Sequence, residues 1–496
     1  HCHLLIRSGK MVLKVAVAVA VCLSLVVSAK CKTLPEEEEL STPISEISDR
    51  ANLDSDAIDT TKSGSASPNE SLPVIRYDGT QLWRIPIRYT DKKERETVSE
   101  LLNKYGRWLI SSKIVKFHDA FIDINYFFIF PIETKTWMAS EGIIDVLIKQ
   151  EKIEGASRLL EKSNLTHVVL IEDLQSAIDS ENPPKEEIEM FQNRKGHRMT
   201  WKAYHRLGDI HSYLDYLAKA YPDICSVHTI GQSHQNRALK LIKISNRNTN
   251  NRKIWIDGGI HAREWISPAT VTYVVDQLVE NWDELPSYMR SIDWYILPVL
   301  NPDGYEYTQY DRLWRKNRRT AGSCIGADLN RNFGHKWGGQ GVSKNPCVET
   351  FGGNKAFSEP ETLAVKNFFS KYVPGTFKSY MTFHSYGQYI LYPWGFDRTV
   401  PTDYKELDRV GREAAANMVR IGGARYQVGS SGNLLYPAAG GSDDWAKAAM
   451  GIKYSYTVEM RDTGRYGFIL PANQIEITSK EGWAFVSTVA KAVSQA

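Results

Sequence analysis

The stretch KIWIDGGIHAREWISPATVTYVVDQLVENW, residues 253–282, contains a strand, a loop and a helix in succession. Its first residues are aromatic or β-branched, as in a buried strand, and a Gly-Gly pair then ends that pattern. From residue 267 onward apolar residues recur at helical spacing. Two polar side chains, His261 and Glu264, stand in the loop between strand and helix. The stretch predicts a β-loop-α unit whose function is concentrated at the end of its strand.

The same alternation extends over residues 199–496. Strand-like runs are followed by helical ones, and the strand-like runs are KIWIDGG, SIDWYILPVL, YMTFHSY and YSYTVEM. Such alternation predicts an α/β domain with a mostly parallel or mixed sheet and with its sites at strand ends.

A metal site is indicated by three of these loop and strand-end residues. His261 and Glu264 can turn toward one cation in a tight loop, although an H-x-x-E pair alone is more often ordinary surface chemistry. His384 ends the apolar strand YMTFH, where a polar side chain is costly unless it is bonded. Together they match the three ligands, histidine and carboxylate, of a catalytic zinc site with one open position.

Further charged residues are candidates for substrate contact. GADLNRNF holds Asp328, Asn330 and Arg331, and DRLWRKNRR holds Arg312 and Arg315. The guanidinium fork suits a carboxylate or a developing oxyanion. The alternative for the second cluster is a solvated basic face.

Three further features of the sequence differ in what they predict. For Arg318 and Arg319 we keep the interpretation of a solvated face. Glu459 lies on an otherwise apolar and hydroxyl-bearing strand, and buried glutamates are rare unless they are paired or catalytic. In GGSDDW, Asp443 and Asp444 are either a turn and helix cap or a ligand group.

The N-terminal part reads as a leader followed by a polar tract. Residues 1–29 hold a basic residue, an apolar run too short to span a bilayer and a small-residue end, as in a secretory signal peptide. Residues 30–75 are acidic and poor in aromatics, and we expect them to be disordered. The protein is thus expected to be secreted.

Three more segments follow. Residues 76–180 read as a small α+β unit, in which we interpret 125–142 as inserted; a buried strand is the alternative. Residues 181–198 form an exposed linker that ends in basic residues and that trypsin-like proteases could cut. Residues 199–496 form the large domain.

Cysteine usage fits an oxidising compartment. Cys2 and Cys22 belong to the leader, and Cys324 and Cys347 bracket a glycine-rich loop, so we predict a disulfide between them. We expect Cys225 to be a buried free thiol. A net charge of +3 without a Lys/Arg block gives no reason to expect nucleic acid, and no segment after the leader predicts a membrane span. We expect a monomer.

With these residues together, the chain resembles a secreted zinc metallocarboxypeptidase of the A/B family in its proenzyme form. HAREW, DLNRN, FHSY, YPAAGGSDDW and EMRDTGRYGFILP match its signature segments in order over 199–496. The resemblance implies a central mixed sheet of the eight-stranded type flanked by helices. It also implies that 76–180 is an open-sandwich pro-segment that caps the active site until cleavage.

The resemblance also assigns roles. It implies one Zn²⁺ per catalytic domain, held by His261, Glu264 and His384. The other matched residues are Glu459 as general base, Arg315 as oxyanion stabiliser, Asn330, Arg331 and Tyr436 as carboxylate binders, Arg263 on the approach for preceding residues, and the Cys324–Cys347 disulfide. Asp328 suits a partner of a zinc histidine.

Asp443 matches the floor of the pocket for the last side chain, with Ser431 and Gly395 in its walls. An enclosed aspartate would pair with Lys or Arg, which predicts peptide and protein substrates with basic ends. The alternatives are a preference for aliphatic, aromatic or acidic ends, an inactive binding relative and, least favoured, a non-enzymatic adhesion protein. We expect a trypsin-like protease to activate the proenzyme; cleavage after Arg198 is favoured, and cleavage after Arg194 or Lys195 is the alternative.

Overall fold

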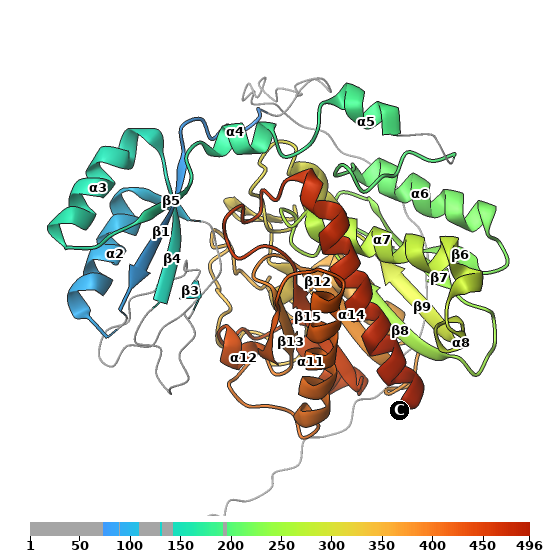
Figure 1. Ribbon diagram of the computed structural model, residues 1–496. Helices are drawn as coiled ribbons and strands as arrows, with labels where there is room; N and C mark the ends of the chain where they lie inside the picture. The colour runs from blue at the N-terminus through green and yellow to red at the C-terminus, as the bar shows by residue number, and fades with distance from the viewer. Residues whose placement is uncertain (1–72, 89, 109–128, 131–141, 192–195) are drawn as a thin grey trace, which may run out of the picture. The chain divides into compact units, whose positions relative to one another are not determined.

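The computed structural model describes residues 73–88, 90–108, 129–130, 142–191 and 196–496 (Figure 1). Several predictions fall outside these ranges. They are the leader at 1–29, residues 30–72 of the acidic segment, and 125–128 and 131–141 of the segment that we interpret as inserted.

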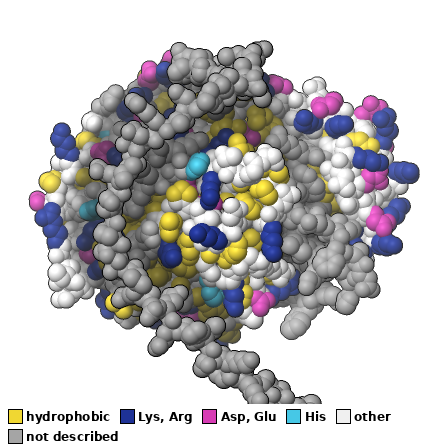
Figure 2. Space-filling model, turned by 180° about the vertical axis from the view of Figure 1, so that it is seen from behind, with side chains coloured by type: hydrophobic (Ala, Val, Ile, Leu, Met, Phe, Trp, Pro, Cys, Tyr) yellow, Lys and Arg dark blue, Asp and Glu magenta, His cyan; other side chains and the backbone are white. Residues whose placement is uncertain are grey.

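The surface of the described parts mixes charges of both signs. On the face that Figure 2 shows, Lys and Arg side chains lie singly or in small groups among uncharged atoms. Along the helices, exposed charges form ion pairs such as Lys104–Glu100 at 2.7 Å and Arg158–Glu154 at 2.6 Å. Such exposed pairs contribute little stability. No helix among the described residues is long and apolar enough to cross a bilayer.

The first unit is an open sandwich, a sheet with helices on one face. Its strands are β1 (Gln81–Ile87), β2 (Gly106–Trp108), β3 (Ile129–Phe130), β4 (Gly142–Ile148) and β5 (Val168–Ile171), ordered β2-β4-β1-β5 with β3 also paired to β4. Alternate residues of β1, Trp83, Ile85 and Ile87, pack on the helices α2 (Lys92–Lys104) and α3 (Ile153–Lys162).

A connecting segment joins this unit to the large domain. It contains α4 (Leu174–Asp179) and α5 (Lys185–Phe191). Between them, the Glu181 carboxylate accepts two hydrogen bonds from the Arg312 guanidinium, at 2.7 and 2.6 Å, and both side chains are buried. Arg312 is therefore a buried ion-pair partner and not part of a solvated basic face.

The large domain is built on an eight-stranded mixed sheet ordered β14-β13-β15-β12-β8-β9-β7-β6. Within this sheet, four neighbouring strands are parallel, in the order β15-β12-β8-β9. The edge strand β14 is parallel to β13. The remaining pairings are antiparallel. The strands are β6 (Cys225–Gln232), β7 (Ala238–Ile244), β8 (Arg252–Asp257), β9 (Ile292–Leu297), β12 (Phe377–His384), β13 (Tyr389–Tyr392), β14 (Gln427–Ser430) and β15 (Tyr454–Glu459).

Helices cover both faces of this sheet. On β8, Ile254 and Ile256 face a core shared with α6, α7, α11 and α14, while Trp255 faces a core shared with α10 and α13. In Figure 1, α14 lies in front of β12 and β8, which it contacts. The helices are α6 (Leu207–Ala220), α7 (Ile266–Glu280), α8 (Ser287–Arg290), α9 (Pro302–Tyr307), α10 (Pro360–Phe369), α11 (Tyr404–Arg420), α12 (Ser431–Leu434), α13 (Ser442–Met450) and α14 (Ile475–Gln495). The predicted fold class is confirmed.

The position of the site follows from three adjacent strands. β12 lies between β8 and β15 and is parallel to both. In this register His384 is opposite Glu459, and Thr382 is opposite Asp257. Because carboxyl ends of parallel strands meet at one edge, the residues that follow β8, β12 and β15 come together there.

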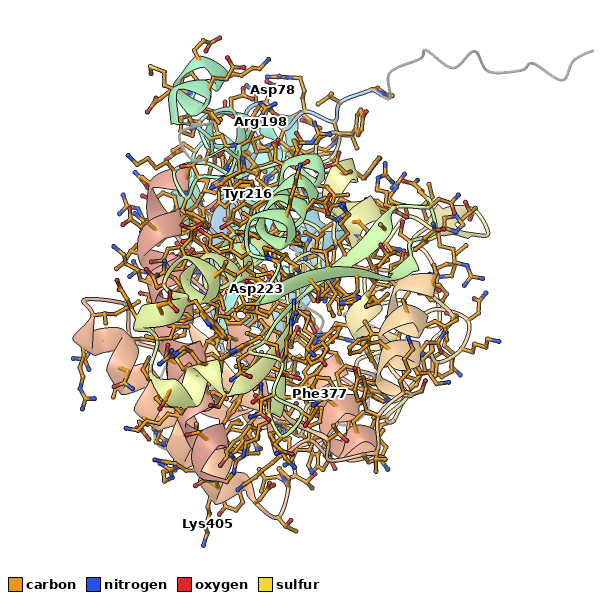
Figure 3. All side chains as sticks on the ribbon, turned by 90° about the vertical axis from the view of Figure 1, so that its right-hand side faces the viewer. Asp78, Arg198, Tyr216, Asp223, Phe377 and Lys405 are labelled. Carbon is orange, nitrogen blue, oxygen red and sulfur yellow. A yellow bond between two sulfur atoms is a disulfide. The ribbon has the colours of Figure 1, made fainter. Side chains whose placement is uncertain are left out.

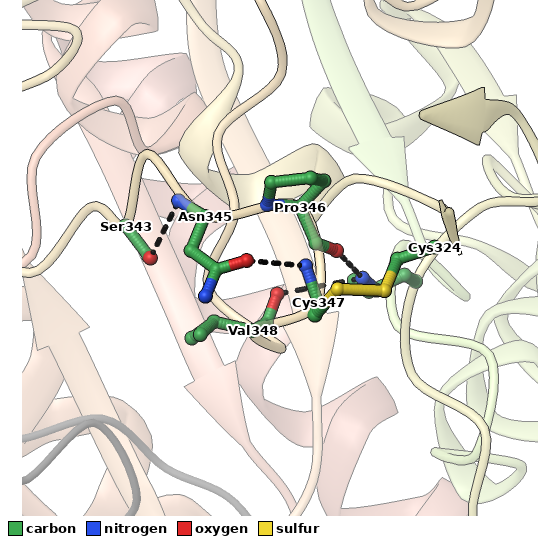
Figure 4. Close-up of a disulfide and its surroundings, with 7 residues drawn as sticks. Cys324, Ser343, Asn345, Pro346, Cys347 and Val348 are labelled. Atoms are coloured by element: carbon green, nitrogen blue, oxygen red, sulfur yellow. Dashed lines mark hydrogen bonds between the residues drawn. A yellow bond between two sulfur atoms is a disulfide. The ribbon is translucent and has the colours of Figure 1, made fainter. Parts of the chain in front are cut away.

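The predicted disulfide is present and braces a long loop. Cys324, in the short hairpin of β10 (Thr320–Ala321) and β11 (Cys324–Ile325), is bonded to Cys347 across 23 residues. Figure 4 shows how the loop around it is tied down: the Asn345 side chain accepts a bond from Cys347 N at 3.0 Å, while its backbone N donates to the Ser343 hydroxyl. Cys225 is a buried free thiol, as predicted, and burial raises its pKa to about 12.

The interpretation of Arg318 and Arg319 as a solvated face is wrong. The Arg318 guanidinium stacks 3.4 Å from the centre of the Tyr307 ring. Arg319 donates to the carbonyl of Ser358 at 2.8 Å and to the largely buried Glu359 carboxylate at 3.1 Å. Both arginines fix the loop before the disulfide, because each has a partner from another segment.

Candidate active site

Three buried side chains converge beyond the carboxyl ends of β8 and β12. His261 Nδ1 lies 2.8 Å from Glu264 Oε1, and His384 Nδ1 lies 3.2 Å from Glu264 Oε2. The two Nδ1 atoms are themselves 3.2 Å apart. The ligand atoms of all three residues fit within 4.8 Å of one another.

This arrangement suits a metal ion. The Nε2 atom of His261 is 3.1 Å from Asp328 Oδ1, and because a carboxylate only accepts hydrogen bonds, Nε2 carries the hydrogen and Nδ1 is bare. The lone pair of this bare Nδ1 faces a second imidazole nitrogen and a carboxylate. A cation bound between these electron-rich atoms would offset their mutual repulsion. Two histidine nitrogens and a carboxylate are a common zinc donor set.

The loop that carries His261 and Glu264 is held tightly. A Cβ on Gly258 would lie 2.9 Å from the Ser267 hydroxyl and 3.1 Å from the carbonyl of Pro298, and Gly259 has a φ of +64°. The Ser267 hydroxyl accepts from Gly259 N and donates to Phe383 O, at 2.9 and 2.6 Å. The start of α7 is thereby bonded to both the loop and β12, which explains the Gly-Gly pair.

A cleft opens at this edge of the sheet. The predicted site residues that line it are His261, Glu264, Arg315, Asn330, Arg331, Tyr436, Asp443 and Glu459. His384 belongs to the group of three candidate metal ligands, which we call the metal cluster, and Asp328 is fully buried behind this group. The structure therefore brings nearly all of the predicted residues to one place.

Glu459 ends β15 directly beside His384. Burial raises the pKa of its carboxyl to about 8 in the absence of a cation. A metal ion in the neighbouring cluster would lower that pKa, because an opposite charge favours the ionised form. The position suits a base that has to hold and release a proton.

Asp328 links two parts of the site. One oxygen contacts His261, and the other accepts from Arg315 Nη2 at 2.8 Å. Burial alone would raise the pKa of Asp328, but the Arg315 and Arg331 guanidinium groups hold it well below its usual range. A permanently ionised Asp328 orients His261 and fixes Arg315 at the rim of the metal cluster.

The groups predicted to bind a terminal carboxylate are oriented by backbone contacts. Arg331 Nη1 donates to the carbonyl of Asn330 at 2.8 Å, and Arg331 Nε donates to Gly341 O at 3.2 Å. The Asn330 side-chain oxygen accepts from Ser442 N at 2.9 Å, which leaves its Nδ2 group as a donor for a carboxylate. Tyr436 follows α12 and also lines the cleft.

The two adjacent aspartates of α13 have different surroundings. Asp444 accepts from Gly395 N and Phe396 N, both at 2.8 Å, and so fixes a loop. Asp443 is 5% exposed and lines the cleft together with Leu391, Ser431 and Gly395. Burial raises the pKa of the Asp443 carboxyl.

Arg263 does not line this cleft. It is buried, donates to Leu313 O at 3.3 Å and stacks 4.2 Å from the Phe468 ring centre. It borders a second cavity with Glu349 and with Tyr77 of the first unit. Neither Glu349 nor Tyr77 was predicted from sequence, since neither lies in a strand-end motif.

Three buried candidate metal ligands at the carboxyl edge of a mixed α/β sheet, with a buried glutamate next to them, are the arrangement expected of a zinc hydrolase. The family model described as zinc carboxypeptidase matches residues 210–485, and that described as carboxypeptidase activation peptide matches residues 132–181. The chain belongs to the zinc carboxypeptidase family. It is a metallocarboxypeptidase in zymogen form, with one zinc ion per catalytic domain.

Individual relatives carry different names. Carboxypeptidase B of Astacus astacus is 46% identical over 299 residues, which make up 60% of this chain and 98% of that protein. Carboxypeptidase A4 of Mus musculus is 40% identical over 353 residues, or 70% and 83%. The crystal structure of thrombin activatable fibrinolysis inhibitor superposes with a TM-score of 0.72 at 31% identity and covers 84% of this chain and 100% of that one. Both A-type and B-type enzymes are thus among the relatives.

Proposed function

We propose that this protein is a secreted carboxypeptidase that removes C-terminal lysine or arginine from peptides and proteins. The observation that carries the proposal is the buried Asp443 carboxylate in the wall of the cleft. A cationic end supplies a counter-charge to that carboxylate, whereas an aliphatic or aromatic end leaves its buried charge uncompensated, which is strongly unfavourable. The similarity to a carboxypeptidase B supports the same preference.

The metal is proposed to be bound by His261, Glu264 and His384. Zinc held there supplies a Lewis acid for the scissile carbonyl and makes water acidic enough to react near neutral pH. Each histidine presents Nδ1, so its other nitrogen has to be bonded elsewhere. For His261 that partner is Asp328.

Proton transfer falls to Glu459 and charge stabilisation to Arg315. Glu459 takes the proton of the attacking water and delivers it to the leaving amine, which keeps the proton count of the site unchanged. Arg315, held by Asp328, meets the negative charge that develops on the carbonyl oxygen.

Substrate position is set at the terminal carboxylate. Arg331 presents a guanidinium group and Asn330 a side-chain amide to that carboxylate, and only the end of a peptide carries such a group. This explains why a single residue is removed at a time. Arg263 is proposed to line the approach for the residues before the scissile bond.

Tyr436 is proposed to close over the bound carboxylate. Tyr436→Phe should lower kcat/KM about 10–100-fold, because a hydrogen bond to a charged group contributes about 1.5–3 kcal/mol. The loss should be mainly in KM, measured with the activated enzyme on an Arg-ended peptide. The same peptide with a C-terminal amide is the control: it lacks the carboxylate, so the variant and the unaltered enzyme should treat it alike. Unchanged kinetics on the free acid would contradict the role.

Latency is proposed to come from the first unit. Its apolar residues Leu82 and Leu147 share a cluster with Phe468 and Ile469 of the catalytic domain. The Tyr77 hydroxyl donates to Asp311 at 2.6 Å. These contacts cover the approach beside Arg263 until the linker is cut.

We propose that activation follows cleavage after Arg198 by a trypsin-like protease. Arg198 is exposed and lies against α6, where its Nε is 3.5 Å from Asp209 Oδ1 (Figure 3). N-terminal sequencing of the trypsin-activated enzyme should give Met199 as the first residue. An enzyme that begins at Lys195 or Gly196 would contradict this site and show cleavage after Arg194 or Lys195 instead.

The decisive assay compares substrates that differ only in their last residue. The trypsin-treated protein should release Lys or Arg far faster than Phe, Leu or Glu, and a chelator should abolish all release. Faster release of Phe or Leu would indicate an A-type enzyme, and activity that survives the chelator would contradict the zinc mechanism.

A further inference from the structure

A buried polar chain lies behind His384, on the side away from the metal cluster. The Thr382 hydroxyl is 3.3 Å from His384 Nε2 and 2.6 Å from Asp257 Oδ1. Asp257 and Thr382 are completely buried and His384 is 1% exposed. None of the roles assigned to the site so far uses Asp257 or Thr382.

The register of the sheet brings these three side chains together. β8 and β12 are parallel with Asp257 opposite Thr382. His384 stands two residues after Thr382 on the same strand, so both side chains point to the same face. A carboxylate on β8 thereby reaches the histidine of β12 through one hydroxyl.

The donor and the acceptor of each hydrogen bond between these side chains can be assigned. The other Asp257 oxygen, Oδ2, accepts from Trp255 Nε1 at 2.6 Å. A carboxylate only accepts, so the single hydroxyl hydrogen of Thr382 goes to Asp257 Oδ1. The Thr382 oxygen is then left as an acceptor, and the group that it faces is His384 Nε2.

We propose that Asp257 and Thr382 form a relay that holds the hydrogen of His384 on Nε2 and keeps Nδ1 bare for zinc. The inference rests on the proposed role of His384 as a zinc ligand. Asp257 and Thr382 are positioning residues, because they act through His384. The two zinc histidines would thus be oriented in different ways: His261 by a direct carboxylate, and His384 by a carboxylate acting through a hydroxyl.

A purely structural role makes a different prediction. If the Thr382–Asp257 bond only ties β8 to β12, its loss should lower stability without changing the affinity for zinc. If it sets the tautomer, the affinity for zinc should fall even in a well-folded protein. Loss of a partner of this kind typically lowers metal affinity about 10–100-fold.

The test compares Thr382→Val with Thr382→Ser in the full-length chain. Val conserves the shape and removes the hydroxyl, whereas Ser conserves the hydroxyl. We expect Thr382→Val to raise the zinc dissociation constant about 10–100-fold, measured by chelator competition. The zinc dissociation constant of Thr382→Ser should stay close to that of the unaltered protein. Thr488→Val, which removes a buried hydroxyl of α14, is the matched control and should leave zinc affinity unchanged.

Asp257→Asn provides a second reading that does not depend on how Val packs. The amide oxygen is needed by Trp255 Nε1, so the amide NH₂ would face Thr382 and donate to it. The hydroxyl hydrogen would then turn toward His384 Nε2 and favour the wrong tautomer. We expect a similar loss of zinc affinity. The melting temperature of the zinc-free protein is measured as well, so that a loss of zinc affinity can be told apart from a loss of stability.

The outcomes separate this inference from the proposed function. Zinc affinity that is unchanged in both Thr382→Val and Asp257→Asn, or lost equally in Thr382→Ser, would overturn the relay. His384→Ala tests the ligand itself: tight zinc binding in that variant would overturn the proposed ligand set instead.

Discussion

Glu459→Gln should lower kcat about 10²–10⁴-fold, the range over which a positioned general base contributes. Glutamine has the shape of glutamate but cannot take the proton of the attacking water. Glu459 lies opposite His384 in the register of β12 and β15, at the edge where the cleft opens. The measurement is kcat and KM of the trypsin-activated variant on an Arg-ended peptide.

The fall should appear in kcat with zinc content unchanged, because Glu459 is not among the three clustered ligand groups. Glu476→Gln is a suitable control, since Glu476 is exposed at the start of α14 and pairs with the exposed Lys480. A Glu459→Gln enzyme within tenfold of the unaltered kcat would exclude Glu459 as the base. A variant that loses its zinc would show instead that Glu459 supports the metal cluster.

The sequence was sufficient to predict the metal cluster because its residues follow strand ends. His261 and Glu264 come after one buried strand, and His384 ends another. Carboxyl ends of parallel strands meet at one edge, so closeness in space could be expected without any coordinates. The same reasoning found Glu459 at the end of β15.

The relay behind His384 could not be predicted in this way. Its geometry depends on which residue of β8 stands opposite Thr382, and the register of β8 and β12 shifts between Phe377 and Ser379. Counting along either strand does not reveal such an irregularity. A signal was nevertheless present: Asp257 and Thr382 are polar residues in otherwise apolar strand segments, each close to a ligand.

Asp443 and Asp444 show a second limit. Neighbouring residues of a helix point about 100° apart, so only one of two adjacent acids can face a given cleft. Which one does so depends on how α13 is rotated against the loop at Gly395, and that is set by tertiary packing. Arg312 is a similar case, because its partner Glu181 lies 131 residues away in the chain.

Asp443→Ile should reverse the preference for the last residue. In the unaltered enzyme a Lys or Arg end restores a counter-charge to the buried carboxylate; in the variant the same end would be buried without a partner. Breaking a buried pair costs about 3–5 kcal/mol, which corresponds to roughly 10²–10⁴-fold in kcat/KM for Arg-ended peptides. Leu- and Phe-ended peptides should gain, since the isoleucine side chain makes the pocket apolar.

Acid pH should weaken the preference in the unaltered enzyme without any substitution. Burial raises the pKa of Asp443 above that of a free aspartate, so its charge is present above that pKa and is lost as the pH falls through it. The ratio of kcat/KM for Arg-ended over Leu-ended peptides should therefore fall toward acid pH, whereas in Asp443→Ile the ratio should be low at every pH. The ratio is the quantity to measure, because effects on Glu459 and the zinc site act on both peptides and cancel. A ratio that stays high at acid pH, together with an Asp443→Ile enzyme that still prefers Arg, would place the specificity group elsewhere in the cleft.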